Sequence, residues 1–211
     1  MINSKILTYI GYLFLLINVT AYLISYRKKP MAFKVLFYYL VLTLIIQAYG
    51  HVLATQSSYN IFLSHYYFIG QFLILSLFFY KTLKNKLVKP IIYLVISGVL
   101  ISLFAQYFIT PNIYYKFNLF EILITSVPVI IYSFIFLVQR ISNPEKKFNY
   151  FISGLFIYVL CSTLLFVAGN ISSEIKKVIW RANNILYILF QVLIFIEWYR
   201  NFRKKRLINL N

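Results

Sequence analysis

Residues 6–30 read ILTYIGYLFLLINVTAYLISYRKKP, an apolar block that is followed by three cations and a proline. The block itself, 6–26, has about the 20 residues that an α-helix needs to cross roughly 30 Å of hydrocarbon. A cleavable signal peptide carries its cations before the apolar stretch and small residues after it. Here Lys5 precedes the block and the cations at 27–29 follow it, so we expect this segment to remain as a membrane-spanning helix.

Six further apolar blocks of similar length follow, and short polar breaks separate them. An open strand would leave its backbone unpaired in lipid, and the ten-residue alternation of a membrane β-barrel is absent, so each block should be a helix. The expected spans are 6–26, 35–54, 61–81, 90–109, 118–139, 149–169 and 178–199, followed by a basic tail, 200–211. The sequence therefore predicts an all-α, polytopic integral membrane protein, with one seven-transmembrane-helix bundle over 1–211.

The composition agrees with this class and limits the partners. The chain has 211 residues, of which 62% are hydrophobic and 12% charged, against about 25% charged residues in soluble domains. Its net charge of +17 does not form a basic stripe on a soluble element, so we do not expect nucleic-acid binding. Each Lys or Arg beside the membrane instead attracts anionic lipid by about 1 kcal/mol. The expected partners are the lipid bilayer and its anionic lipids.

The cations are shared unevenly between the two sides that such a topology creates. Sixteen of the 21 Lys and Arg residues lie on one side and five on the other. The larger group is Arg27, Lys28, Lys29, Lys34, Lys81, Lys84, Lys86, Lys89, Arg140, Lys146, Lys147, Arg200, Arg203, Lys204, Lys205 and Arg206; the smaller is Lys5, Lys116, Lys176, Lys177 and Arg181. Because cytoplasmic loops carry an excess of Lys and Arg, we expect the N-terminus outside and the C-terminus in the cytoplasm.

With helix directions assigned, the polar residues within the spans can be placed by depth. Many recur at three- or four-residue steps, hence on one helix face, and such faces point into the bundle interior. Most of them lie in the outer half of their span, which predicts a polar cavity that opens away from the cytoplasm. The candidate ligand-binding residues are His51, His65, Gln71, Glu121, Asn170, Arg181 and Asn184.

The ionisable candidates also have a purely structural interpretation. Helix ends lie in the headgroup zone, where polar side chains are tolerated without any function. Glu121 could be an interfacial carboxylate that pairs with Arg181 or Lys116. His51 and His65 could be solvated or hydrogen-bonded histidines with a structural role only.

Three other positions carry a specific expectation. Gln71 lies deeper, where an interhelical hydrogen bond, worth about 0.6 kcal/mol on average, is the alternative to ligand binding. Pro128 lies in the middle of a span, removes the hydrogen bond to the carbonyl of residue 124 and should kink the helix, as a hinge or a packing device. Glu197 precedes Arg200 by three residues, and we expect a local ion pair between them.

Several chemistries known in seven-helix proteins conflict with the residue content. A retinal Schiff base needs a lysine within a helix, and 178–199 contains none. Zinc hydrolases of the ceramidase type use three histidines and an acid, whereas this chain has two His and no Asp. His51, His65 and Glu121 remain one allowed zinc set, and a haem between the two histidines is disfavoured by the short turn that joins their helices. Cys161 is the only cysteine, so a thiolate metal cage is excluded; we expect no cofactor.

The pattern as a whole favours a membrane sensor or signal-transducing protein over an enzyme. It would bind a small solute, for example an anion with Arg181 as charge partner, or a lipid headgroup in the outward-facing polar cavity. Movement around Pro128 would relay binding to a separate cytoplasmic signalling partner. A transporter or homo-oligomeric pore is the first alternative, and a lipid-acting hydrolase with a His/His/Glu metal site is the second. The Ile-, Lys-, Asn- and Phe-rich composition suggests a bacterial inner (cytoplasmic) membrane protein.

Overall fold

The computed structural model describes residues 4–85, 87–142, 145–171 and 176–203, and these residues are almost entirely helical. Seven helices are long and apolar enough to cross a membrane, so the predicted seven-helix fold is confirmed and the chain is an integral membrane protein. The helices are α1 (Ser4–Ile24), α2 (Met31–Thr55), α3 (Phe62–Thr82), α4 (Val88–Ile109), α5 (Leu119–Ser142), α6 (Asn149–Ile171) and α7 (Lys176–Glu197). A 3₁₀ turn η1 (Pro111–Tyr115) precedes α5, and a π-helical turn η2 (Trp198–Phe202) extends α7.

Helix ends differ from the expected spans where local chemistry extends a helix. Helix α2 begins at Met31, four residues before the expected start, and Pro30 is its N-cap, with an extended backbone (φ −62°, ψ 159°). Lys34 therefore lies within the first turn of α2. At the other end of the chain, η2 carries the helical backbone to Phe202, into the segment that we expected to be a tail.

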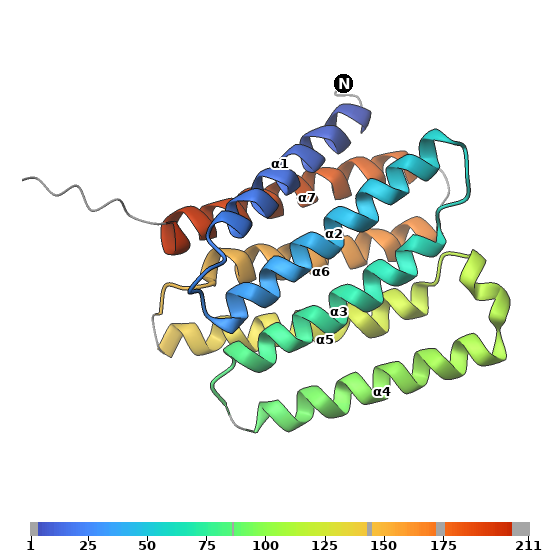
Figure 1. Ribbon diagram of the computed structural model, residues 1–211. Coiled ribbons are helices and arrows are strands. Elements are labelled where there is room, and N and C mark those ends of the chain that lie inside the picture. Colours follow the sequence, from blue (N-terminus) through green and yellow to red (C-terminus); the bar gives the residue numbers. More distant parts are fainter. Residues whose placement is uncertain (1–3, 86, 143–144, 172–175, 204–211) are drawn as a thin grey trace, which may run out of the picture.

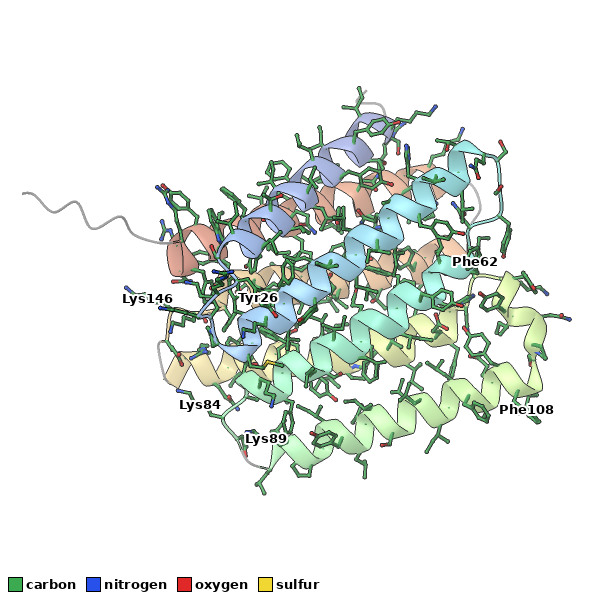
Figure 2. The ribbon with its side chains drawn as sticks, in the orientation of Figure 1. Tyr26, Phe62, Lys84, Lys89, Phe108 and Lys146 are labelled. Carbon is green, nitrogen blue, oxygen red and sulfur yellow. The ribbon has the colours of Figure 1, made fainter. Side chains whose placement is uncertain are left out.

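Consecutive helices run in opposite directions, which gives the bundle two chemically different ends (Figure 1). Figure 2 shows Lys84, Lys89 and Lys146 at one end and Phe62 and Phe108 at the other. We call the first the basic end; it holds the breaks after α1, α3 and α5 and the end of α7. We call the other the opposite end. That the basic end faces the cytoplasm stays a prediction.

Six of the seven helices form a closed ring. The neighbours around it are α1 and α2, α2 and α3, α3 and α5, α5 and α6, α6 and α7, and finally α7 and α1. Helix α4 packs on the outside of this ring, against α3, η1 and α5 (Figure 1), and it is the least buried of the seven. The interior of the protein is therefore the interior of the six-helix ring.

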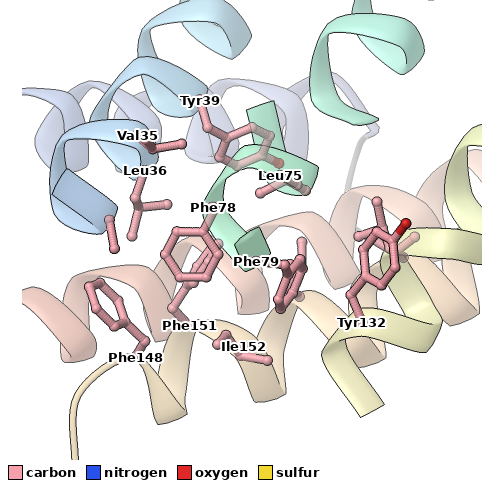
Figure 3. Packing of buried hydrophobic residues seen from close by; sticks show 14 of the residues in the cluster. Val35, Leu36, Tyr39, Leu75, Phe78, Phe79, Tyr132, Phe148, Phe151 and Ile152 are labelled. Carbon is pink, nitrogen blue, oxygen red and sulfur yellow. The ribbon is translucent and has the colours of Figure 1, made fainter. Parts of the chain in front are cut away.

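The part of the ring interior nearer the basic end is filled with aromatic side chains (Figure 3). Phe78 of α3 packs edge-to-face against Phe148 and Phe151, with ring centroids 5.2 Å apart in both pairs. Phe148 also packs against Phe202 of η2. Such pairs contribute about 0.5–1.5 kcal/mol each beyond the area that they bury. This packing closes the ring toward the basic end.

Glu197 joins the end of α7 to the start of α6. Its buried carboxylate accepts backbone N–H groups of Phe148 at 2.6 Å and Tyr150 at 3.1 Å. The expected ion pair with Arg200 is wrong, because Arg200 donates instead to the hydroxyl of Tyr150 at 2.9 Å. The physical reason is that the first N–H groups of α6 have no partner within their own helix, so they attract the nearest carboxylate.

Candidate functional site

The opposite end of the ring contains a cavity of about 920 Å³. All six ring helices contribute to its wall, and α4 does not. Because α2 and α6 run toward this end while α3 and α7 run away from it, the deepest lining residues follow from helix direction. They include Ile46, Ser126 and Val159 as well as the amide and phenol side chains of Gln47, Gln71, Tyr158 and Tyr187. We call these four amide and phenol residues, together with Tyr67 one turn above Gln71, the floor.

The floor consists of amide and phenol groups that are only partly paired with one another. The hydroxyl of Tyr187 donates to Oε1 of Gln47 at 3.3 Å. Gln71 is only 4% exposed, yet its Oε1 has no hydrogen-bond partner in the protein. A buried amide oxygen without a partner costs free energy, so such groups mark places where another molecule or water completes the pairing. The floor therefore contains an acceptor, Oε1 of Gln71, to which a ligand or water can donate.

The wall nearer the mouth has two different sides. On the side of α1, α2 and α7, the ring of His51 packs edge-to-face against Tyr9 and Tyr12, each at 5.8 Å, and Asn184 donates to the hydroxyl of Thr8 at 3.1 Å. This side presents polar groups held by short contacts between helices.

The other side of the mouth is aromatic. Phe166 of α6 lies at its centre and packs against Phe68 of α3 at 5.9 Å, Phe117 before α5 at 5.7 Å, and Trp180 of α7 at 6.4 Å. All four residues line the cavity. The mouth therefore combines a polar side with an apolar side, above a polar floor.

The lining lacks formal charge. Among the described residues around the cavity there is no Lys, Arg, Asp or Glu, and His51 is the one histidine. Hydroxyl and amide groups supply the polarity. This absence of charge limits the ligands that the cavity can accept, because a desolvated ion needs a partner of opposite charge or several hydrogen bonds.

A second polar cluster lies outside the cavity, between α3, α4 and α5. Glu121 is fully buried; its Oε1 pairs with Nδ1 of His65 at 3.0 Å, and its Oε2 accepts the hydroxyl of Tyr107. The remaining imidazole nitrogen of His65 bonds to the backbone carbonyl of Tyr114 at 3.1 Å. The carboxylate, the imidazole and the phenol thus all have hydrogen-bond partners within the protein.

The start of α5 explains why Glu121 lies in this cluster. Asn118 precedes the helix, and its Oδ1 accepts the backbone N–H of Glu121 at 3.2 Å, as an N-cap does. The Asn118 side chain also pairs with Gln106 of α4 through two bonds, 2.9 Å and 3.3 Å. These contacts hold the last turns of α4 and η1 against the ring, so the cluster has a clear structural role.

The predicted site residues are therefore only partly gathered in one place. His51, Gln71 and Asn184 line the cavity. His65 and Glu121 form the separate cluster, and Arg181 of α7 is not among the lining residues. The side chain of Asn170 lies outside the described residues. Ser64, Tyr67 and Gln71 share the cavity face of α3, whereas His65, one residue after Ser64 and so about 100° around the helix, turns toward α5.

The allowed zinc set is not assembled. His51 packs on Tyr9 and Tyr12 of α1, whereas His65 and Glu121 are occupied with each other. Over the described ranges, no three His, Cys, Asp or Glu side chains lie close enough together to hold a metal ion. The His/His/Glu site of the lipid-hydrolase alternative is therefore not brought together among the described residues.

Several polar cavity residues were not among the site residues predicted from the sequence. Tyr158, Ser162 and Thr163 of this helix line the cavity, as does Asn183 of α7. Tyr158 and Ser162 are four residues apart, so the step that identified the other polar faces was present here as well. The same spacing could therefore have identified this face of α6.

The basic end has its own ionic contacts, which centre on Glu145 in the turn after α5. Glu145 accepts from Nη1 of Arg140 at 2.7 Å and pairs with Nζ of Lys84 at 3.3 Å. The hydrogen bond from Arg140 lowers the pKa of the Glu145 carboxyl. This contact links the turn after α3 to the turn after α5, and its contribution to stability is lost as the pH falls through that lowered pKa.

No family model, curated protein or solved structure matches the chain.

Proposed function

We propose that the protein is a membrane sensor, which binds a small molecule or lipid headgroup in the cavity and relays its occupancy along the bundle to a separate partner. The observation that carries this proposal is the shape of the ring interior: a cavity of about 920 Å³ with a polar floor at one end, and solid aromatic packing at the other. A volume of this size is typical of small-molecule sites.

The closed floor favours binding over passage. A transporter or channel needs polar surface along the whole path, and its site commonly lies near the bilayer midplane between repeats. Below the floor of this cavity the ring is filled mainly by Phe78, Phe79, Phe151 and similar side chains, with a few buried polar side chains such as Thr43, Ser76 and Gln191 among them. The transporter and pore hypotheses are therefore less well supported than the sensor.

Helix α7 is suited to carry a signal between the two ends. Tyr187 belongs to the floor, and one turn further on Oε1 of Gln191 accepts from Nδ2 of Asn18 in α1 at 2.8 Å. At the basic end Glu197 holds the start of α6, and the indole of Trp198 donates to Ser25, just after α1, at 2.9 Å. A small shift of α7 on ligand binding would thus change contacts with both of its neighbours at the basic end.

The basic end supplies surfaces for the proposed partners. Lys34 lies over the ring of Tyr26 and Lys89 over that of Tyr80, each at 5.3 Å, and Arg203 lies over Tyr199 at 4.7 Å. Amphipathic pairs of this kind suit the membrane interface, where the cations attract anionic lipid. A cytoplasmic signalling protein, or a second copy of this chain, would receive the signal at the same end.

The two tryptophans of the chain allow a direct test, because Trp180 lines the cavity and Trp198 lies at the basic end. In a Trp198→Phe variant, fluorescence reports on the cavity; in a Trp180→Phe variant, it reports on the basic end. Both variants are reconstituted in phosphatidylcholine nanodiscs and titrated with a panel of small solutes and lipids.

A sensor predicts that the same compound changes both reporters over the same concentration range. If a compound changes Trp180 while Trp198 stays constant, the protein binds without relaying and the sensor proposal is wrong. If no compound changes the emission of Trp180, the cavity is not a ligand site and the proposal also fails.

A further inference from the structure

The residues that line the cavity indicate the chemical class of its ligand. The wall contains amides, hydroxyls, phenols and aromatic rings, and within the described residues it contains no Lys, Arg, Asp or Glu. Arg181, the cation that a bound anion would need, is not part of this wall. An ionic ligand would give up its hydration without gaining an opposite charge, whereas a neutral polar group would find partners.

Two unpaired acceptors indicate what the cavity lacks. Oε1 of Gln71 at the floor and Oδ1 of Asn183 on the wall are buried without a hydrogen-bond partner, as is the floor hydroxyl of Tyr67. The two amide oxygens each need a donor such as a hydroxyl or an N–H, whereas the phenol can donate or accept. A carboxylate or phosphate offers only acceptors, so it satisfies neither amide oxygen, while a neutral hydroxyl or amide can pair with all three groups.

The polarity of the cavity changes with depth. The floor is polar, and one side of the mouth is formed by Phe68, Phe117, Phe166 and Trp180. A molecule that fits both regions has a polar group that reaches the floor and an apolar body that lies against the aromatic side of the mouth. A small solute that is polar throughout would leave these rings without contact.

We propose that the ligand is an uncharged amphiphile: its hydroxyl or amide group donates to Gln71 at the floor, and its hydrocarbon part packs against the aromatic side of the mouth. This inference rests on the proposed function and names the ligand class of the same site. The same chemistry occurs in neutral lipids with a glycerol or similar head and in free apolar alcohols or amides. The proposal therefore specifies a neutral polar group joined to an apolar body.

The test uses the Trp198→Phe protein in phosphatidylcholine nanodiscs and four probes. Monodecanoylglycerol carries a neutral hydroxylated head on a ten-carbon chain. Decanoate, studied above neutral pH, and decyltrimethylammonium have chains of the same length with an anionic or a cationic head. Glycerol has the head alone. The emission of Trp180 gives binding, and the thermal unfolding midpoint of the same samples gives an independent measure.

Two further variants separate binding in the cavity from partition into the bilayer. Gln71→Leu removes the unpaired acceptor at the floor. Gln139→Leu is the same substitution at the basic end, where Gln139 lies beside Arg140 and away from the cavity. Loss of one neutral hydrogen bond corresponds to about a tenfold weaker affinity.

We expect monodecanoylglycerol to bind at least tenfold more tightly than either charged probe and than glycerol. Gln71→Leu should weaken that binding about tenfold, and Gln139→Leu should leave it unchanged. Tighter binding of decanoate or decyltrimethylammonium would overturn the ligand class while retaining a ligand-binding cavity. Equal binding of glycerol would overturn the amphiphile and indicate a water-soluble ligand. If Gln71→Leu and Gln139→Leu respond alike to every probe, the signal arises in the bilayer and both this inference and the sensor proposal fail.

Discussion

Glu197 binds backbone groups at the start of a neighbouring helix. Its carboxylate accepts N–H groups of Phe148 and Tyr150, and it also accepts from Nδ2 of Asn201 at 2.8 Å. The start of a helix carries a partial positive charge, which a carboxylate stabilises. Phe148 has a positive φ of 68°, a conformation that is unfavourable for a residue with a side chain, so its N–H bond to Glu197 helps to hold it there.

We predict that Glu197→Ala lowers the free energy of unfolding by about 2–4 kcal/mol, because it leaves buried N–H groups without an acceptor. Glu197→Gln keeps one acceptor oxygen and should cost about half as much. Thermal or denaturant unfolding of the detergent-purified protein measures both. The expected ion pair with Arg200 is tested by Arg200→Ala, which should cost less than either. An Arg200→Ala variant as unstable as Glu197→Ala would contradict the assignment.

The close contact between helices α6 and α7 depends on a glycine. A Cβ on Gly154 would lie 2.8 Å from Cδ1 and 3.1 Å from Cβ of Leu193 on α7. Gly98 of α4 has nothing within 4 Å of the same position. In membranes, small residues allow helices to approach closely, since packing rather than the hydrophobic effect drives their association.

We therefore predict that Gly154→Ala and Gly98→Ala have opposite effects. Both substitutions gain about 0.5–1 kcal/mol of helix propensity. Gly154→Ala also overpacks the α6–α7 contact, which costs about 1–3 kcal/mol, whereas Gly98→Ala does not. Unfolding curves of the two variants should differ by that packing cost. If the two variants are equally stable, the close contact between α6 and α7 is wrong.

Helix α4 depends on polar contacts at one end more than the ring helices do. It lies outside the ring, and Gln106 and Tyr107 connect its last turns to Asn118 and Glu121. Each such bond is worth about 0.6 kcal/mol on average between membrane helices, so losing all three of them should loosen the end of α4 without unfolding the ring.

We predict that the double variant Gln106→Leu, Tyr107→Phe speeds hydrogen exchange in η1 and the last turns of α4. Exchange in α6 and α7 should stay unchanged. Ser102→Ala is a matched control on the same helix, because Ser102 donates only to the carbonyl of Gly98 within α4. Exchange that rises equally in that control would show that the contacts to Asn118 and Glu121 do not hold α4.

The two ends of the molecule differ in charge, and this difference predicts its orientation in the membrane. In a Cys161→Ser background, Ser58→Cys places a thiol in the exposed turn at the opposite end, and Lys147→Cys places one at the exposed basic end. Because Lys and Arg are retained on the cytoplasmic side, a membrane-impermeant maleimide should label position 58 in intact cells and position 147 only after permeabilisation. The reverse pattern would invert the topology, and with it the direction in which the cavity opens.

Much of the fold follows from the sequence because helix formation and membrane crossing are local properties. Twenty apolar residues suffice for a span, and short polar breaks make neighbouring spans antiparallel. Helix periodicity also indicated that the polar face containing Gln71 points inward. His65 shows the limit of this reasoning: it shares a helical turn with Ser64, but its position around the helix directs it to a different neighbour.

By itself, the sequence determined the number of helices, their order up and down, and the unequal charge of the two ends, since each depends on residues close together in the chain. Only the tertiary structure decided which helices close the ring, that α4 remains outside it, and that Glu121 pairs with His65 and Tyr107 while the described residues of the cavity wall include no Lys, Arg, Asp or Glu. Those outcomes depend on rotation and close packing between helices far apart in the chain, where several arrangements satisfy the same apolar pattern and side-chain contacts select among them.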